Sequence, residues 1–229
     1  MKPRLPRRLL LTAVIGLMAV VTVAGCRVEQ GAAAFVGETR ITDAQVDNVV
    51  DSLPVELVTN DLANVSSAYG GVRHQVLEAL AVVELGRHVA DDTGALPDAD
   101  ARSVARDGWM QQTGLPESNA FVSLMAEAEG YRALLQEGAE PQAPTDTDIE
   151  AAADNFTTAT GQKLQSADLQ QLTADLNSDQ GRRLIGVNRQ IAQYVADYDV
   201  TANPKYGQLS IVTFLNASGV PLLTVPVPN

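Results

Sequence analysis

Few residues in this sequence are arranged for catalysis. The two histidines, His74 and His88, are fourteen positions apart on one expected helix, which separates them by about 21 Å, too far to share a metal ion. The single cysteine is Cys26, and no G-x-S-x-G motif marks a nucleophilic serine. No glycine-rich loop leads from a strand into a helix, so nothing predicts a nucleotide site. We therefore expect no enzyme activity, no metal and no cofactor.

Cys26 follows a stretch that is typical of an export signal. Basic residues precede an apolar run at 9–23, and small residues come just before the cysteine. This run is shorter than the roughly 20 residues that cross a bilayer as a helix. Val23-Ala24-Gly25-Cys26 resembles a bacterial lipobox, which implies a lipoprotein signal peptide at 1–25. A plain secretory signal and an uncut anchor are the alternatives.

Lipidation would also explain an unpaired cysteine in an exported protein. On the lipobox resemblance, Cys26 receives a diacylglyceryl thioether and residues 26–33 form the lipidated tether. The protein is then expected on the extracytoplasmic face of the cell membrane, which it contacts through this lipid.

The chain after the signal is strongly acidic. From residue 26 onward it carries 28 acidic and 12 basic side chains, a formal charge of −16. We expect no nucleic-acid partner, because affinity for phosphate comes mainly from Lys and Arg. The remaining length of about 200 residues is enough to bury a substantial core.

Hydrophobic periodicity predicts a mainly α fold with a small sheet. The expected strands are 34–36, 200–202, 209–215 and 220–225, and prolines limit the last to an edge strand or an irregular tail. The expected helices cover approximately residues 43–53, 72–90, 98–112, 118–135, 145–156, 169–176 and 179–197.

Two helix starts have the spacing of a capping box. Thr42 and Gln45 are three residues apart at the start of the first helix, and Thr147 and Glu150 are three apart near residue 145. The helix at 72–90 has apolar residues on more than one side, which predicts a central, buried position.

Five large apolar side chains are candidates for a peptide-binding groove. Flexible, polarisable Met side chains suit a surface that adapts to different apolar segments, although apolar residues at helical spacing also form ordinary cores. Both interpretations remain open for Trp109, Met110, Phe121, Met125 and Tyr131.

Three short segments carry a resemblance to a known family. Residues 34–46, AFVGETRITDAQV, resemble the opening of SurA- and PrsA-type extracytoplasmic chaperones, with Gly37-Glu38 in place of the usual Asn-Gly turn. Residues 144–150, PTDTDIE, are similar to the helix start that precedes the prolyl isomerase domain of those proteins. Residues 200–207, VTANPKYG, look like the returning strand and turn of actinobacterial SurA-like lipoproteins, with Lys205 in the position of an Arg.

This resemblance implies a SurA N-terminal-like helical chaperone domain at 34–207, followed by a β-rich C-terminal segment at 208–229. It implies that the strand near Val36 pairs with the strand near Val200. A parvulin isomerase domain takes about 90 residues in that family, whereas the chain has only 22 between Phe156 and Asp179. We therefore expect no isomerase activity.

The function implied is a lipid-anchored, non-catalytic holdase. Its partners would be unfolded or partly folded exported proteins. Two alternatives remain open: a structural or adaptor lipoprotein that binds one specific envelope partner, and a lipoprotein that binds a small apolar ligand between its helices.

Overall fold

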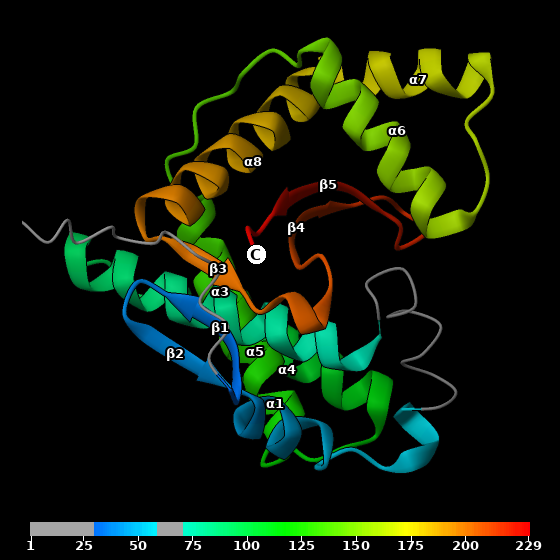
Figure 1. Cartoon of the computed structure of the whole chain (residues 1–229). Helices are drawn as coiled ribbons and strands as arrows, with labels where there is room; N and C mark the ends of the chain where they lie inside the picture. Colours follow the sequence, from blue (N-terminus) through cyan, green and yellow to red (C-terminus); the bar gives the residue numbers. More distant parts are fainter. Residues whose placement is uncertain (1–29, 59–70) are drawn as a thin grey trace, which may run out of the picture.

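Helices predominate in the fold, with small antiparallel sheets, as the sequence predicted (Figure 1). The computed structural model describes residues 30–58 and 71–229, so the predicted signal peptide and Cys26 lie outside the described residues. The strands are β1 (Ala32–Val36), β2 (Thr39–Thr42), β3 (Val200–Ala202), β4 (Ser210–Leu215) and β5 (Pro221–Pro226). The helices are α1 (Asp43–Val50), α3 (Val72–Thr93), α4 (Ala99–Thr113), α5 (Ala120–Gln136), α6 (Asp146–Thr160), α7 (Ser166–Asn177) and α8 (Asp179–Asp197).

Strand β1 joins the two ends of the domain. It pairs with β2 on one side and with β3 on the other, both antiparallel. Val36 lies opposite Val200 and Ala34 lies opposite Ala202, which confirms the predicted pairing of the N-terminal strand with the returning strand.

The β1–β2 turn consists of two residues, Gly37 and Glu38, because Val36 is paired directly with Thr39. Gly37 has a φ of +57°, a backbone conformation that glycine adopts without a steric cost. Its N–H donates to the carbonyl of Tyr198 at 2.7 Å, which fixes the turn to the end of α8. Glycine at the first position of the turn therefore provides the backbone conformation that this two-residue turn requires.

The N-terminal strand begins earlier than predicted. We expected a tether up to residue 33, but β1 starts at Ala32, and the side chains of Ala32 and Ala33 are fully buried. The buried Asn203 explains the difference, since its side-chain amide donates to the Ala32 carbonyl at 2.9 Å and its N–H donates to the Ala33 carbonyl at 2.9 Å. The small side chains of Ala32 and Ala33 allow this segment to pack closely, so it is not a free tether. The composition of the segment does not reveal its contact with Asn203.

Capping explains where α1 and α6 begin. Thr42 and Gln45 form the predicted capping box at α1, with Gln45 N–H donating to Thr42 Oγ1 at 3.2 Å and Thr42 N–H donating to Gln45 Oε1 at 2.7 Å. At α6 the predicted box of Thr147 and Glu150 is wrong. The cap is two residues earlier, at Thr145 with Asp148, because a short acidic side chain also reaches back to the cap N–H.

Asp148 also connects α6 to α8 through an ion pair. Arg189 Nη2 lies 2.7 Å from Asp148 Oδ2. Burial alone would raise the pKa of Asp148, but hydrogen bonds from Thr145 and Arg189 outweigh it and hold that pKa below its usual value of 3.8. The segment around residue 145 is therefore a helix start that is fixed to α8, the helix that leads back to β3.

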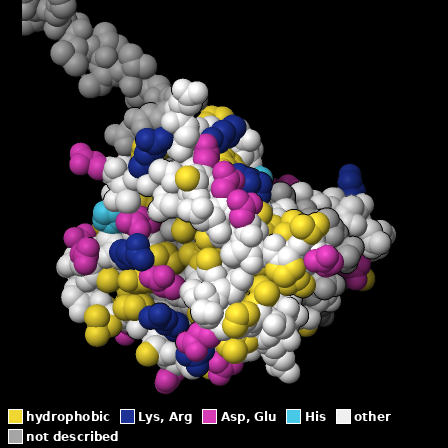
Figure 2. Space-filling model, turned by 90° about the horizontal axis from the view of Figure 1, so that it is seen from below, with side chains coloured by type: hydrophobic (Ala, Val, Ile, Leu, Met, Phe, Trp, Pro, Cys, Tyr) yellow, Lys and Arg dark blue, Asp and Glu magenta, His cyan; other side chains and the backbone are white. Residues whose placement is uncertain are grey.

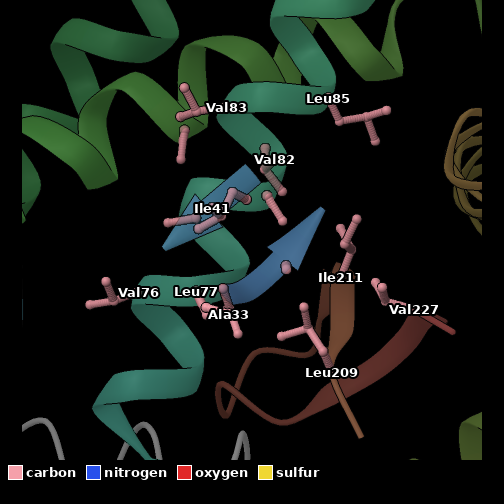
Figure 3. Packing of buried hydrophobic residues seen from close by; sticks show 14 of the residues in the cluster. Ala33, Ile41, Val76, Leu77, Val82, Val83, Leu85, Leu209, Ile211 and Val227 are labelled. Atoms are coloured by element: carbon pink, nitrogen blue, oxygen red, sulfur yellow. The ribbon is translucent and has the colours of Figure 1, made fainter. Parts of the chain in front are cut away.

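Helix α3 occupies the centre of the larger core, as predicted. Its residues Val76, Leu77 and Leu85 are fully buried. Figure 3 shows α3 beside Ala33 and Ile41 of the sheet, with Leu209, Ile211 and Val227 of the C-terminal segment in the same cluster. The C-terminal segment is thus part of this core.

The β4–β5 hairpin also forms a second, smaller core. Leu222 and Leu223 of β5 are buried against side chains of α6, α7 and α8, namely Ala152, Leu172, Leu176 and Ile185. In Figure 1, α6 and α8 cover the hairpin on the side away from α1, and α7 packs against these two helices. Between α6 and α8 the chain forms one helix, α7, with no room for a further domain.

Candidate peptide-binding groove

The structure brings two of the five candidate residues to one groove. Trp109 and Met125 line it together with residues of α3, α5 and β4, and its volume is about 450 Å³. We call it the α3–β4 groove. It is lined by Gln75, Glu78, Trp109, Gln112, Met125, Glu129, Arg132, Gln136, Val212, Thr213, Phe214 and Leu215.

Trp109 is held in place by an aromatic contact. Its ring packs edge-to-face on Phe121 of α5, with ring centroids 5.2 Å apart and an interplanar angle of 88°, an arrangement that aromatic pairs favour. Phe121 is fully buried and so provides a fixed support below the indole. Trp109 itself is partly exposed, which leaves part of its ring available to the groove.

A glycine allows α4 and α5 to approach closely. Glycine within a helix usually weakens it, but Gly130 of α5 faces the start of α4. A Cβ at Gly130 would lie 3.0 Å from the Asp98 carbonyl oxygen. The Asp98 N–H donates to the Gly130 carbonyl at 3.0 Å. This contact fixes α4, and with it Trp109, relative to α5.

The other candidates do not line the groove. Phe121 belongs to the core, and Met110 is partly buried outside the lining. Tyr131 packs on α3, where a Cβ on Gly86 would lie 2.5 Å from its ring. Tyr131 is six positions after Met125, so the two side chains point about 120° apart around α5. Trp109 therefore lines the groove, Phe121 belongs to the core, and Tyr131 forms a helix–helix contact. Met125 lines the groove but is also part of the core, with 8% of its surface exposed, and Met110 belongs to none of these groups.

A buried ion cluster lies in the wall of the groove. Arg132 Nη2 is 3.1 Å from Glu78 Oε1, and Arg132 Nη1 is 2.6 Å from Glu129 Oε2. The Glu78 side chain is 8% exposed and that of Arg132 is 17% exposed, whereas Glu129 is 43% exposed. One cation thus faces two carboxylates. Burial raises the pKa of Glu78, and Arg132 and the Val212 N–H oppose that rise.

Strand β4 supplies the opposite wall. Among the described strands β4 pairs only with β5, so its other edge carries no strand. The Val212 N–H at that edge donates to Glu78 Oε1 at 3.0 Å. Residues 213–215 of β4 line the groove beyond this contact, and Leu215 is 45% exposed.

Sequence reasoning missed Glu78, Arg132 and the β4 wall. The one local signal was a glutamate within a helix that is apolar on several sides, since Glu78 stands between Leu77 and Ala79. A charged residue in that position needs a partner, but the partner is 54 residues away and only the packing of α3 on α5 identifies it.

Both histidines pack against tyrosine rings. His88 stacks on Tyr198 with ring centroids 5.7 Å apart, and His74 contacts Tyr206 edge-on at 6.3 Å. Asp92 accepts a hydrogen bond from the Tyr198 hydroxyl at 2.7 Å and raises the pKa of Tyr198 to about 12. Within residues 30–58 and 71–229, no group of three or more His, Cys, Asp or Glu side chains is placed to hold a metal.

A second hollow, of about 870 Å³, is lined by Asp43, Arg73 and Tyr206 among others. Its walls include Val58 and Gly71, which flank the segment outside the described residues. The α3–β4 groove is therefore the better defined candidate.

Comparisons with protein-family models, curated proteins and solved structures found no match to this chain. Among the helices described, none is long and apolar enough to cross a membrane.

Proposed function

We propose that this protein is a non-catalytic holdase that binds extended apolar segments of unfolded or partly folded exported proteins. It acts on the extracytoplasmic face of the cell membrane, to which a lipid on Cys26 anchors it. The observation that carries the proposal is the α3–β4 groove, which combines Trp109 and Met125 with an edge of β4 that pairs with no other described strand. The resemblance of residues 34–46 and 200–207 to SurA- and PrsA-type chaperones supports it.

The groove has the properties that weak, varied binding requires. Apolar burial is non-directional and contributes about 25 cal/mol per Å², and Met125 can adapt to side chains of different shape. The polar residues of the lining, such as Gln112 and Glu129, keep the open groove compatible with water. Figure 2 shows exposed hydrophobic side chains interspersed with acidic and basic ones on one face of the molecule.

A pair of exposed leucines provides the test. Leu215→Ser removes an apolar side chain that lines the groove, whereas Leu96→Ser changes a side chain that is 83% exposed and lies outside it. We expect Leu215→Ser to raise by about fivefold the concentration that halves the aggregation of an unfolded client, because part of a leucine contact is lost. Leu96→Ser should act like the wild type.

Light scattering of several unrelated unfolded proteins measures this effect. Equal loss in both variants would place the binding surface elsewhere, and no suppression by the wild type would contradict the proposed function. Binding of one specific envelope protein without any effect on aggregation would support the adaptor alternative instead.

A further inference from the structure

The start of β1 determines which end of the domain is nearest to Cys26. The Gly31 carbonyl accepts a hydrogen bond from the Asp43 N–H of α1 at 3.0 Å, and the Gln30 carbonyl accepts one from Arg40 Nη2 at 2.8 Å. Gln30 is only four residues after Cys26, and four residues span at most about 14 Å even when fully extended. A lipid on Cys26 would therefore hold this end of the domain close to the membrane surface.

Basic side chains gather at the same end. Besides Arg40, Lys205 forms an ion pair with Asp43, and Arg73 Nη2 lies 2.5 Å from Asp47 Oδ1, one turn further along α1. The side chains of Arg73 and Lys205 are 48% and 43% exposed, so both remain accessible to a further anion. These three basic and two acidic groups sum to one positive charge, in a chain whose formal charge is −12.

The opposite end of the domain is acidic. Helix α3 has 22 residues and is therefore about 33 Å long. Its first turn contains Arg73, and its last turns approach the β1–β2 turn through Tyr198, which contacts both Asp92 and Gly37. Figure 1 shows α1 at one end of the three-stranded sheet and the β1–β2 turn at the other. Within the described residues, the exposed acidic side chains around this turn are Glu38, Asp91, Asp92, Asp197 and Asp199.

This distribution of charge favours one orientation on an anionic bilayer. A short tether limits the height of the β1 start alone, and it would still allow the domain to lie on its side. Lying on its side would bring the acidic end to the headgroups, which repel it within a Debye length. Basic residues near the surface are attracted instead. Arg27, directly after Cys26, adds a positive charge next to the lipid.

We propose that the domain stands on an anionic lipid bilayer on the end where β1 begins. Arg40, Arg73 and Lys205 face the headgroup phosphates, and the acidic end around Glu38 and Asp92 points away from the membrane. This inference rests on the proposed lipid anchor at Cys26, and it adds a membrane-binding surface to the proposed function.

Two exposed alanines provide matched labelling positions at the two ends. Ala44 follows Asp43 in the first turn of α1, and Ala196 precedes Asp197 in the last turn of α8. In the lipidated protein the thiol of Cys26 is blocked, so a fluorophore attaches only to the new cysteine of Ala44→Cys or Ala196→Cys. Each labelled protein is placed on vesicles of phosphatidylcholine and phosphatidylglycerol that carry a nitroxide quencher on their headgroups.

We expect the label of Ala44→Cys to be quenched at least about fivefold more strongly than that of Ala196→Cys. A nitroxide quenches only at short range, and α3 alone separates the two ends by about 33 Å. The ratio of the two quenching constants therefore reports the orientation of the domain. Circular dichroism of both labelled variants should match that of the wild type, since both positions are exposed.

A substitution at Lys205 tests the contribution of charge. Lys205→Gln should reduce the quenching ratio by about half, because one attraction to the headgroups is lost. Arg183→Gln is the matched control, since it removes an exposed cation from the first two turns of α8 and should leave the ratio unchanged. Vesicles of phosphatidylcholine alone, or added salt, should lower the ratio as Lys205→Gln does.

The outcomes separate this inference from the proposals on which it rests. Equal quenching of the two labels, or stronger quenching in Ala196→Cys, would overturn the orientation and leave the lipid anchor standing. A ratio that changes neither with Lys205→Gln nor on phosphatidylcholine would overturn the role of charge. Failure of the protein to float with the vesicles would overturn the anchor itself, whereas the aggregation assay tests the holdase function independently. A high ratio that falls in Lys205→Gln but not in Arg183→Gln supports the inference.

Discussion

Replacing Arg132 with methionine is expected to destabilise the protein by about 3–5 kcal/mol. The guanidinium pairs with Glu78, whose side chain is only 8% exposed, and with Glu129. Without Arg132, the Glu78 carboxylate would stay buried between α3 and β4 with the Val212 N–H as its remaining donor. An unpaired buried charge is costly, so the loss should far exceed the net contribution of the ion pair itself.

Two further variants make this prediction specific. The double variant Glu78→Gln with Arg132→Met has no unpaired carboxylate at residue 78, but the glutamine still accepts a hydrogen bond from the Val212 N–H. It should therefore recover at least half of the free energy of unfolding that Arg132→Met loses. Arg87→Met breaks ion pairs with Glu84 and Glu127, but the Arg87 side chain is 48% exposed, and the cost should stay below about 1 kcal/mol. Urea unfolding followed by circular dichroism measures all three; equal losses for Arg132→Met and Arg87→Met would contradict the buried cluster.

Gly186→Ala should also be strongly destabilising, by about 3 kcal/mol. A Cβ at Gly186 would lie 2.0 Å from the carbonyl oxygen of Glu140, because the 137–145 linker crosses α8 at this residue. The Gln142 N–H donates to the Arg182 carbonyl at 2.8 Å and Gln190 Nε2 donates to the Glu137 carbonyl at 2.9 Å, so the linker cannot move aside without losing these bonds.

Gly108→Ala is the matched control for this prediction. Gly108 is also within a helix, α4, but apart from its neighbouring residues and the nearby backbone of its own helix no atom lies within 4 Å of a Cβ built there. This variant should gain about 0.5–1 kcal/mol, since alanine favours the helix over glycine. Thermal unfolding of both variants gives the comparison, and a stable Gly186→Ala protein would show that the linker does not rest on α8.

Local signals were enough to predict most of the helices and strands. The predicted 179–197 helix matches α8 residue for residue, and the Thr42 capping box and the central position of α3 are confirmed. These features depend on residues that are near in sequence. The early start of β1 depends on the contact of Asn203 with a segment far away in the sequence. The crossing of the linker over α8 likewise depends on Gly186. Local composition gives no signal for either contact.

The candidate site was predicted only in part for the same reason. Side-chain type identified Trp109 and Met125, but it could not separate them from Tyr131, which faces α3, or show that Met125 is itself 8% exposed and part of the core that contains Phe121. Residues 213–215 of β4 were expected to be extended, yet only the packed structure shows that this strand and α5 line the same groove. Lipidation of Cys26 and the absence of catalysis stay predictions.

The most direct test of the holdase proposal uses the fluorescence of Trp109, the single tryptophan of the chain. Titration with a tryptophan-free unfolded protein should shift the Trp109 emission to shorter wavelength in a saturable way, because a bound segment excludes water from the indole in the α3–β4 groove. The shift should require a higher client concentration in the Leu215→Ser variant. Suppression of client aggregation with no change in Trp109 emission would contradict the claim that clients bind in this groove.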